Sequence, residues 1–317
     1  MIYSQKPRTE KFIEKRIKYI RPSEWKDICR YQTLSEAFIE KHKDKVDWRI
    51  VSRCQRLSQS FIAKHVHRVN WQQIFMAQKL TPLFIKLNAG DRPHSMLWTM
   101  VSMYQNLSED FIARNANLVN WGTIVQYQSL SEAFLKKHEN KWRSTMFSSD
   151  VFKYQKLSKD YRERQDIFRR DEIEDFCDDF LGVDSNKESW LYTSTEDKLK
   201  YIKKNTKYKV VDDEYIIAYK SIRNDGYSVY NFQYKYEVGG IYSSQCDCNT
   251  KNENSFGLSA WNKKQAKRYH GNGRLLKVKI NIEDIGAIVH DNDRIRCFKL
   301  EVLSEVKPWY KKLFNKS

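Results

Sequence analysis

The chain has 317 residues, of which 40% are hydrophobic and 31% charged, and this composition predicts a folded protein with room for two domains. Gly and Pro number only 10 and 5, which excludes collagen-like and linker-like chains. No apolar run of 18 residues occurs and the N-terminus lacks the apolar stretch of a secretory signal, so we expect no membrane span and no secretion. Six scattered cysteines fit reduced thiols in an intracellular protein.

The net charge of +17 is unevenly distributed along the chain. Residues 1–100 hold 20 Lys and Arg against 9 Asp and Glu, and residues 251–317 hold 15 against 7. Basic surfaces attract phosphate backbones, so nucleic-acid binding by the two ends is one hypothesis, and solvated surface lysines are the other. Residues 171–184 hold seven carboxylates, which are expected to form the wet face of an amphipathic helix.

Internal repetition dominates the N-terminal half. Leu recurs at positions 34, 57, 80, 107, 130 and 157, and the repeated unit reads W-x6-Q-x-L-[ST]-x2-[FY]. At helical spacing, aromatic side chains are typical of a core rather than of a ligand site. The predicted repeat core consists of Trp25, Trp48, Trp71, Trp98, Trp121, Phe38, Phe61, Phe84, Phe111 and Phe134.

Each repeat carries two helix-start signals. A Ser or Thr follows every repeat Leu, as Ser35 follows Leu34, and such a side chain accepts a hydrogen bond from a free N–H of the first turn. A second helix is expected after Asp47, Asn70 and Asn120, each directly before a Trp. The unit is therefore predicted to be two helices of about two turns, and because such short helices are unstable alone, the units must stack into an α-solenoid.

Three further features of the repeat lead to expectations. The two 27-residue intervals carry insertions near 87–97 and 138–149, which are expected in the loop between the helices of a unit. The recurring Gln is expected to satisfy helix-end carbonyls or to bridge to the next repeat. Trp71 shares a helix face with Ile74 and Phe75, so we predict that Trp71 is buried.

The repeat, as in LSEAFIEKHKDKVDWRIVSRCQ, resembles the short helical repeats found in many copies in proteins of giant DNA viruses and some phages. The resemblance covers residues 19–165. It implies a viral or phage origin, and with it a location in the host cytoplasm or the virion. It implies no particular reaction.

The pattern changes after residue 165. Residues 166–208 are expected to be helical and acidic, with a last helix over 196–205. Further on, the alternation predicts strands over 214–220, 234–242, 256–261, 273–282, 285–290 and 294–303, with a helix over 262–270 and a hairpin loop at 291–293. The predicted fold class is α+β: an N-terminal α-solenoid of short helix-pair repeats and a small C-terminal mixed α+β domain with a barrel-like sheet.

These patterns divide the chain into five segments. Solenoids present long groove surfaces, so binding is expected of the repeat segment. The segments are a basic N-terminal segment at 1–18, a six-copy repeat solenoid at 19–165, an acidic helical connector at 166–210, an α+β domain at 211–306 and a basic tail at 307–317.

The C-terminal half resembles a small domain of phage and viral proteins over residues 214–304. The resemblance rests on the segments AYK (218–220), YEVGGIY (236–242), FGLSAW (256–261) and RIRCFKLEVL (294–303), with Ser259 where a His is common. Its strand order and Gly step are also similar to the ADP-ribosyltransferase-like fold, which implies an NAD site.

Candidate residues for such a site come from three predicted strands. They are Tyr219 and Lys220 on the first strand, Ser259 and Trp261 after the Gly257 step, and Glu301 on the last strand. Alternation places Tyr219 and Lys220 on opposite faces, so only one of the two lines a cleft. Glu301, between Leu300 and Val302, is expected to face solvent.

Other chemical sites find little support in the sequence. Cys246-x-Cys248 supplies one short-spaced thiol pair, with Cys297 and His270 nearby, whereas tetrahedral zinc sites usually need two such pairs. No Walker, GxGxxG, HExxH or GxSxG motif is present. We therefore expect no metal and no cofactor.

The function favoured by these observations is that of a non-enzymatic viral or phage protein, a binding or assembly module that serves as a virion component or engages a host target. A protein partner is expected. The first alternative is an ADP-ribosyltransferase-like enzyme with candidates Tyr219, Ser259 and Glu301, and the second is sequence-independent nucleic-acid binding by the basic ends. The sequence leaves the partner and the oligomeric state open.

Overall fold

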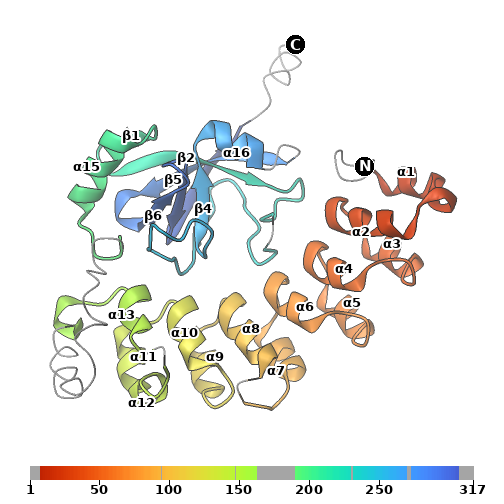
Figure 1. The fold of residues 1–317 in the computed structure, drawn as a ribbon, viewed down its shortest axis with the longest axis horizontal. Coiled ribbons are helices and arrows are strands. Elements are labelled where there is room, and N and C mark those ends of the chain that lie inside the picture. The colour runs from red at the N-terminus through yellow and green to blue at the C-terminus, as the bar shows by residue number, and fades with distance from the viewer. Residues whose placement is uncertain are drawn as a thin grey trace, which may run out of the picture. The chain divides into compact units, whose positions relative to one another are not determined.

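The computed structural model describes residues 8–93, 95–146, 148–162, 190–229, 231–269 and 273–306. The chain packs as two compact units, the first made of residues 1–119 and 223–235 and the second of residues 120–222 and 236–317. A run of short helices precedes an antiparallel sheet, so the predicted α+β fold class is confirmed (Figure 1). The acidic run at 171–184 lies outside the described residues.

The first unit consists of stacked helix pairs. In each pair the second helix packs against the second helix of the next pair, so that α2, α4, α6 and α8 follow one another in a row (Figure 1). The elements are α1 (Glu10–Lys15), η1 (Ile17–Tyr19), α2 (Pro22–Tyr31), α3 (Glu36–Lys41), α4 (Trp48–Cys54), α5 (Gln59–Lys64), α6 (Trp71–Ala77), α7 (Pro82–Ala89), α8 (Met96–Tyr104) and α9 (Glu109–Arg114).

The predicted helix caps are present. Ser35 Oγ accepts a hydrogen bond from Phe38 N at 3.1 Å, and Ser58 Oγ accepts one from Phe61 N at 3.1 Å. Asp47 caps α4 in the same way, through Ile50 N at 3.0 Å. Short side-chain acceptors therefore begin both helices of a unit, as the sequence predicts.

A further copy of the first helix precedes the predicted array. Residues 9–16 read TEKFIEKR, which matches SEAFIEKH at 35–42. Thr9 caps α1 through Phe12 N, and Ile13 is fully buried against the next pair. The stretch expected as a basic N-terminal segment thus contains a repeat helix, which escaped notice because this copy lacks the Leu that marks the others.

The second unit combines further helix pairs with the sheet. Its helices are α10 (Trp121–Tyr127), α11 (Glu132–Lys137), α12 (Glu139–Trp142), α13 (Asp150–Tyr154), α15 (Thr195–Asn205) and α16 (Lys263–Tyr269). Both insertions lie between the helices of a pair, as expected: residues 90–95 link α7 to α8, and α12 lies between α11 and α13.

The sheet is antiparallel throughout, with the order β3-β8-β5-β2-β4-β7-β6, and β1 also pairs with β2. One face carries the core, because alternate residues of the central strands, such as Ile216, Val278 and Val302, are fully buried. The elements are β1 (Lys209–Val211), β2 (Tyr215–Ile222), β3 (Ile241–Ser243), β4 (Leu258–Trp261), β5 (Arg274–Asn281), η2 (Ile282–Asp284), β6 (Ile285–Val289), β7 (Arg294–Cys297) and β8 (Lys299–Glu305).

Two strand predictions differ from the structure, and one strand was not predicted. The strand expected over 234–242 is reduced to β3, because Gly239 adopts a positive φ of 82° and turns the chain. The strand expected over 294–303 is two strands, since the chain changes neighbours at Phe298: β7 pairs with β4 and β6, and β8 pairs with β5 and β3. Strand β1 was not predicted.

Candidate binding groove

The repeat Gln connects successive repeats in the core. Gln55 is fully buried, and its Nε2 donates to the carbonyl oxygens of Cys29 at 2.6 Å and Gln32 at 2.8 Å. Its Oε1 accepts from Leu34 N at 2.9 Å. Gln78 repeats the arrangement one unit later. One amide therefore satisfies two helix-end carbonyls and bridges to the preceding repeat, which are the two roles expected from the sequence.

A second set of contacts connects the helix starts. Glu36, the first residue of α3, accepts hydrogen bonds from the backbone N–H and the hydroxyl of Ser58. Gln59 receives the same two bonds from Thr81, at 3.3 and 2.8 Å. The turns at the starts of α5 and α7 are therefore each held by the preceding repeat.

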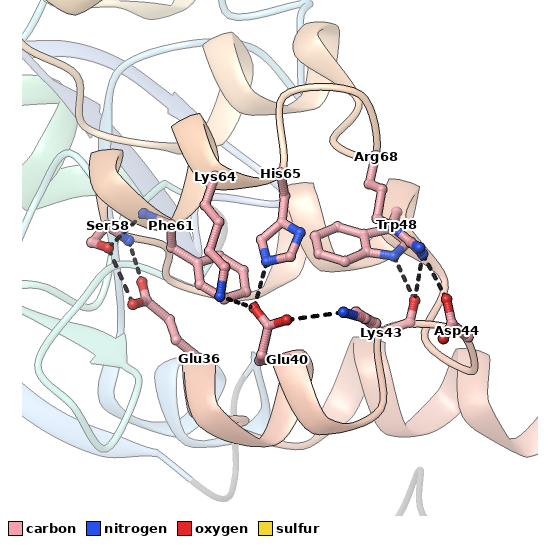
Figure 2. A network of polar contacts seen from close by, with 10 residues as sticks. All are labelled: Glu36, Glu40, Lys43, Asp44, Trp48, Ser58, Phe61, Lys64, His65 and Arg68. Atoms are coloured by element: carbon pink, nitrogen blue, oxygen red, sulfur yellow. Dashed lines mark hydrogen bonds and ion pairs between the residues drawn. The ribbon is translucent and has the colours of Figure 1, made fainter.

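A charged network connects α3 and the loop after it to α5 and the loop after it (Figure 2). Glu40 Oε2 lies 2.8 Å from Lys64 Nζ and 2.8 Å from His65 Nε2. Hydrogen bonds from Lys64 and His65 lower the pKa of the Glu40 carboxyl to about 2. The His65 ring also packs on Trp48 and Phe61, with centroids 4.8 and 4.5 Å away, so the recurring His belongs to the repeat architecture.

The predicted aromatic core is largely buried. Trp25, Trp98, Trp121, Phe38, Phe61, Phe111 and Phe134 are buried, whereas Trp48, Trp71 and Phe84 are partly buried. The prediction that Trp71 is buried is therefore only partly correct. Its ring contacts Phe75 and Phe84, but Asn88 stands where His42 and His65 cover the neighbouring indoles.

Within the first unit, the turns of three successive repeats line a groove of about 720 Å³. Its floor is the Q-x-L-[ST] segment of each repeat, and one wall comes from the segment 223–235, here called the wall segment. The lining residues are Thr33, Leu34, Ser35, Glu36, Arg56, Leu57, Ser58, Gln59, Gln78, Lys79, Leu80, Thr81, Asp225, Tyr227 and Phe232.

The wall segment is held by carbonyls at the ends of the second helices. Arg223 Nη1 donates to Cys54 O at 3.2 Å, and Phe232 N donates to Ala77 O at 2.9 Å. Gln233 Nε2 donates to Tyr104 O. These three acceptors each precede a repeat Gln, so the same repeat position is used three times.

The charged side chains of the groove differ in whether they already have polar partners. The Glu36 carboxylate is occupied by Ser58, and the Asp225 carboxylate by Arg223 Nε at 3.3 Å and Tyr227 N at 3.2 Å. Arg56 stacks over the Tyr227 ring, 5.0 Å from its centroid. Asp225 is neutralised by Arg223, whereas Glu36, which in the described part of the chain is bonded only by the neutral Ser58, keeps its charge. Arg56 and Lys79 have no carboxylate partner among the described residues, so the groove offers two unneutralised cations and one unneutralised carboxylate.

The enzyme candidates do not gather at one centre. Tyr219 pairs with Trp261 across β2 and β4, which makes Ser259 a diagonal neighbour of Tyr219. Glu301 lies on β8, and β5 separates β8 from β2, so two strand spacings of together roughly 10 Å lie between Glu301 and Tyr219 across the sheet. The two residues are also offset along the strands, because Tyr219 is opposite Lys277 of β5 and Glu301 is opposite Lys279. The register therefore leaves Glu301 apart from the other two.

Lys220 lies on the other face of the same strand. It is only 7% exposed, and its Nζ donates to Ser259 O at 2.8 Å. Burial lowers the pKa of the Lys220 ammonium to about 8. The hydrogen bond to a backbone carbonyl links β2 to β4, so the side chain serves the sheet.

The three thiols described in the second unit are buried. Cys246, Cys248 and Cys297 are each fully buried, and burial raises the pKa of the Cys297 thiol to about 12. Gly286 leaves room for the first two, since a Cβ there would lie 2.4 Å from Cys246 Sγ. No cluster of three metal-ligating side chains occurs among the residues described, and His270 lies outside them.

Two elements of the groove carry no signal in the sequence. The wall segment has no repeat signal, and its place beside the helices follows from tertiary contacts alone. The groove cations Arg56 and Lys79 occupy the position between the repeat Gln and the repeat Leu. The flanking Gln and Leu recur, but the residue between them varies, as Thr33 and Lys79 show, so it gave no signal.

No protein-family model, curated protein or solved structure matches the chain. The viral or phage origin implied by the resemblances stays a prediction. Within the described parts of the chain, none of the helices combines the length and apolar character needed to cross a bilayer.

Proposed function

We propose that this protein is a binding module that holds an extended segment of a partner protein in the groove of the first unit. The observation that carries the proposal is the groove itself, which runs over three repeat turns and encloses about 720 Å³. Solenoid repeats offer extended surfaces of this kind to ligands that also extend.

The rigidity of the groove supports the proposal. Its floor is fixed by the buried amides of Gln55 and Gln78, and its wall by hydrogen bonds to Cys54 O and Ala77 O. A preformed site loses less conformational entropy when a ligand binds, so the ligand binds with higher affinity.

The test is a selection of displayed random peptides on the full chain. Thr33→Trp introduces an indole into the groove at an exposed position, and Ser129→Trp introduces one at the same repeat position away from it. We expect the selected peptides to lose binding to Thr33→Trp and to keep it with Ser129→Trp. Equal binding to both variants and the natural chain contradicts the groove as the site.

Sequence-independent nucleic-acid binding is the second candidate, favoured by the net charge of +17. If the basic ends neutralise phosphates, the affinity for single-stranded DNA falls steeply as salt rises, with a slope set by the number of phosphates contacted. A filter-binding titration measures this slope, and no retention at low salt removes the candidate.

The enzyme alternative receives no support from the geometry. Glu301 is separated from Tyr219 and Ser259 by the intervening strands, so these residues do not surround one reacting carbon.

A further inference from the structure

From the charges of the groove we infer that its ligand is an acidic segment in an extended conformation, with two carboxylates spaced three residues apart. The inference rests on the proposed function and specifies its ligand. It concerns Arg56 and Lys79, which occupy the same position in successive repeats and both line the groove.

The first step is the sign of the available charge. Both carboxylates of the lining, Glu36 and Asp225, already accept hydrogen bonds from Ser58 and from Arg223 and Tyr227. Arg56 and Lys79 make no ion pair with any described residue. An incoming carboxylate therefore finds two cations without an ion-pair partner, whereas an incoming cation finds one such carboxylate, Glu36, because Arg223 already neutralises Asp225.

The second step is the spacing. Helices α4 and α6 pack side by side, and packed helices lie about 8–10 Å apart, so equivalent residues of successive repeats are separated by about the same distance. A polyproline II segment rises about 3.1 Å per residue with three residues per turn. Side chains three residues apart thus point the same way, about 9 Å from one another, which matches Arg56 and Lys79.

The third step separates a peptide from a nucleic acid. A nucleic-acid backbone carries a continuous row of charges, and its binding proteins commonly contact several phosphates in succession. In this groove the two cations are accompanied by the unneutralised carboxylate of Glu36, which repels a continuous anion. Discrete carboxylates separated by uncharged residues suit this pattern better.

The experiment measures the affinity of the full chain for short Pro-rich peptides by fluorescence anisotropy. One peptide carries two Glu three residues apart, a second carries them adjacent, a third carries Gln in their place, and a fourth carries two Lys three residues apart. The protein variants are the double charge reversal Arg56→Glu with Lys79→Glu, and Lys156→Glu, which changes the same repeat position outside the groove.

We expect the spaced Glu peptide to bind the natural chain and Lys156→Glu alike, and to lose about tenfold or more in affinity on the double reversal. The Lys peptide is expected to bind the double-reversal variant in preference to the natural chain, and such a charge-swap rescue shows that this variant is folded. Equal affinity of the spaced Glu peptide for all three proteins overturns the inference.

Two other outcomes separate this inference from the proposed function. If the Gln peptide binds as tightly as the spaced Glu peptide and Thr33→Trp abolishes both, the groove binds peptides but not through charge, and only the inference fails. If no peptide binds while the double reversal abolishes retention of single-stranded DNA, both fail in favour of nucleic acid.

Discussion

Each repeat Gln completes several buried hydrogen bonds with one side chain. Gln78 donates to Ser52 O and Gln55 O, at 2.9 and 2.7 Å, and accepts from Leu57 N at 3.1 Å. A buried backbone group left without a partner costs about 1–3 kcal/mol. The stacking of neighbouring repeats therefore depends on one side chain in each repeat, the repeat Gln.

Gln78→Leu should lower the free energy of unfolding by about 2–4 kcal/mol, because three buried backbone groups lose their partner. Urea unfolding followed by circular dichroism measures the loss. Gln72→Leu, an exposed change in the same helix, is the control and should stay within about 0.5 kcal/mol. Similar midpoints for the two variants would show that water replaces the amide.

Glu40 makes the stability of the helix pairs depend on pH. Hydrogen bonds from Lys64 and His65 hold its pKa at about 2, below the ordinary value of 4.5. A carboxyl with a depressed folded-state pKa stabilises the protein above its unfolded pKa, and this stabilisation is lost as the pH falls toward the folded value. The relevant window is therefore between pH 4.5 and about 2.

We expect Glu40→Gln to reduce the thermal midpoint at neutral pH and to flatten its decline between pH 4.5 and about 2. Differential scanning calorimetry at several pH values measures both effects. Glu301→Gln, which changes a carboxylate without an ion pair among the described residues, is the control. Parallel declines for the Glu40 variant and the natural chain would contradict the role given to this network.

At the scale of the element, the helix pairs are not equally packed. Trp98 is fully buried in α8 and its Nε1 donates to Gly90 O at 2.8 Å, whereas Trp71 in α6 is only partly buried. The repeat pattern treats the two indoles as equivalent, but the residues that cover them differ.

Trp98→Ala should therefore cost about 3–5 kcal/mol of unfolding free energy, as large-to-small core changes do, and Trp71→Ala distinctly less. Guanidinium unfolding of both variants decides the order. Equal losses would mean that the partial exposure of Trp71 has no energetic consequence.

The end of the pair formed by α11 and α13 is closed by a residue from outside the repeat. Tyr192 Oη lies 3.3 Å from Phe152 O and 3.0 Å from Gln155 O, and it receives a backbone hydrogen bond from Leu157. Gln155 uses the same three positions of the preceding repeat, on Val125 O, Gln128 O and Leu130 N. The tyrosine hydroxyl thus stands where the Gln of a further repeat would lie.

Tyr192→Phe should destabilise this end by about 1–2 kcal/mol and increase hydrogen exchange in α13, because helix-end carbonyls lose their donor. Tyr201→Phe removes a hydroxyl that contacts the Asn292 side chain at the surface and serves as the control. Unchanged exchange in α13 of the Tyr192 variant would show that its hydroxyl closes nothing.

At the scale of the whole molecule, buried thiols report on both units. Cys29 lies in the core of the first unit, and burial raises its pKa to about 12. In the second unit, burial raises the pKa of Cys246 well above its ordinary value and that of Cys297 to about 12. Because of these raised pKa values, the three thiols stay protonated even in mildly alkaline buffer. They are expected to react slowly, since the thiolate is the reactive species.

Of the five cysteines in the described residues, iodoacetamide at pH 8 to 9 should modify Cys54, which is partly exposed, and spare Cys29, Cys246, Cys248 and Cys297. Mass spectrometry of the digested protein identifies the modified sites. Adding urea should expose the four buried thiols as the units unfold. Rapid labelling of Cys246 or Cys248 without denaturant would contradict the packing of the sheet against them.

The sequence by itself determined the local elements of this protein. Caps such as Ser35 and Asp47, the aromatic spacing and the strand alternation act within a few residues, so helix starts, helix pairs and most strands follow from the chain order. The α+β class and the structural role of the Gln column belong to the same category, because a repeated residue must satisfy the same contacts in each copy.

Only the tertiary structure decided which distant residues meet. The wall segment lies on the carbonyls of Cys54 and Ala77, and Tyr192 replaces a Gln, although neither carries a local pattern. The break at Phe298 and the separation of Glu301 from Tyr219 depend on which strands become neighbours. These outcomes follow from packing over the whole chain. The hydrogen-bond partners lie far apart in sequence, and the local periodicity of the sequence does not predict such pairs.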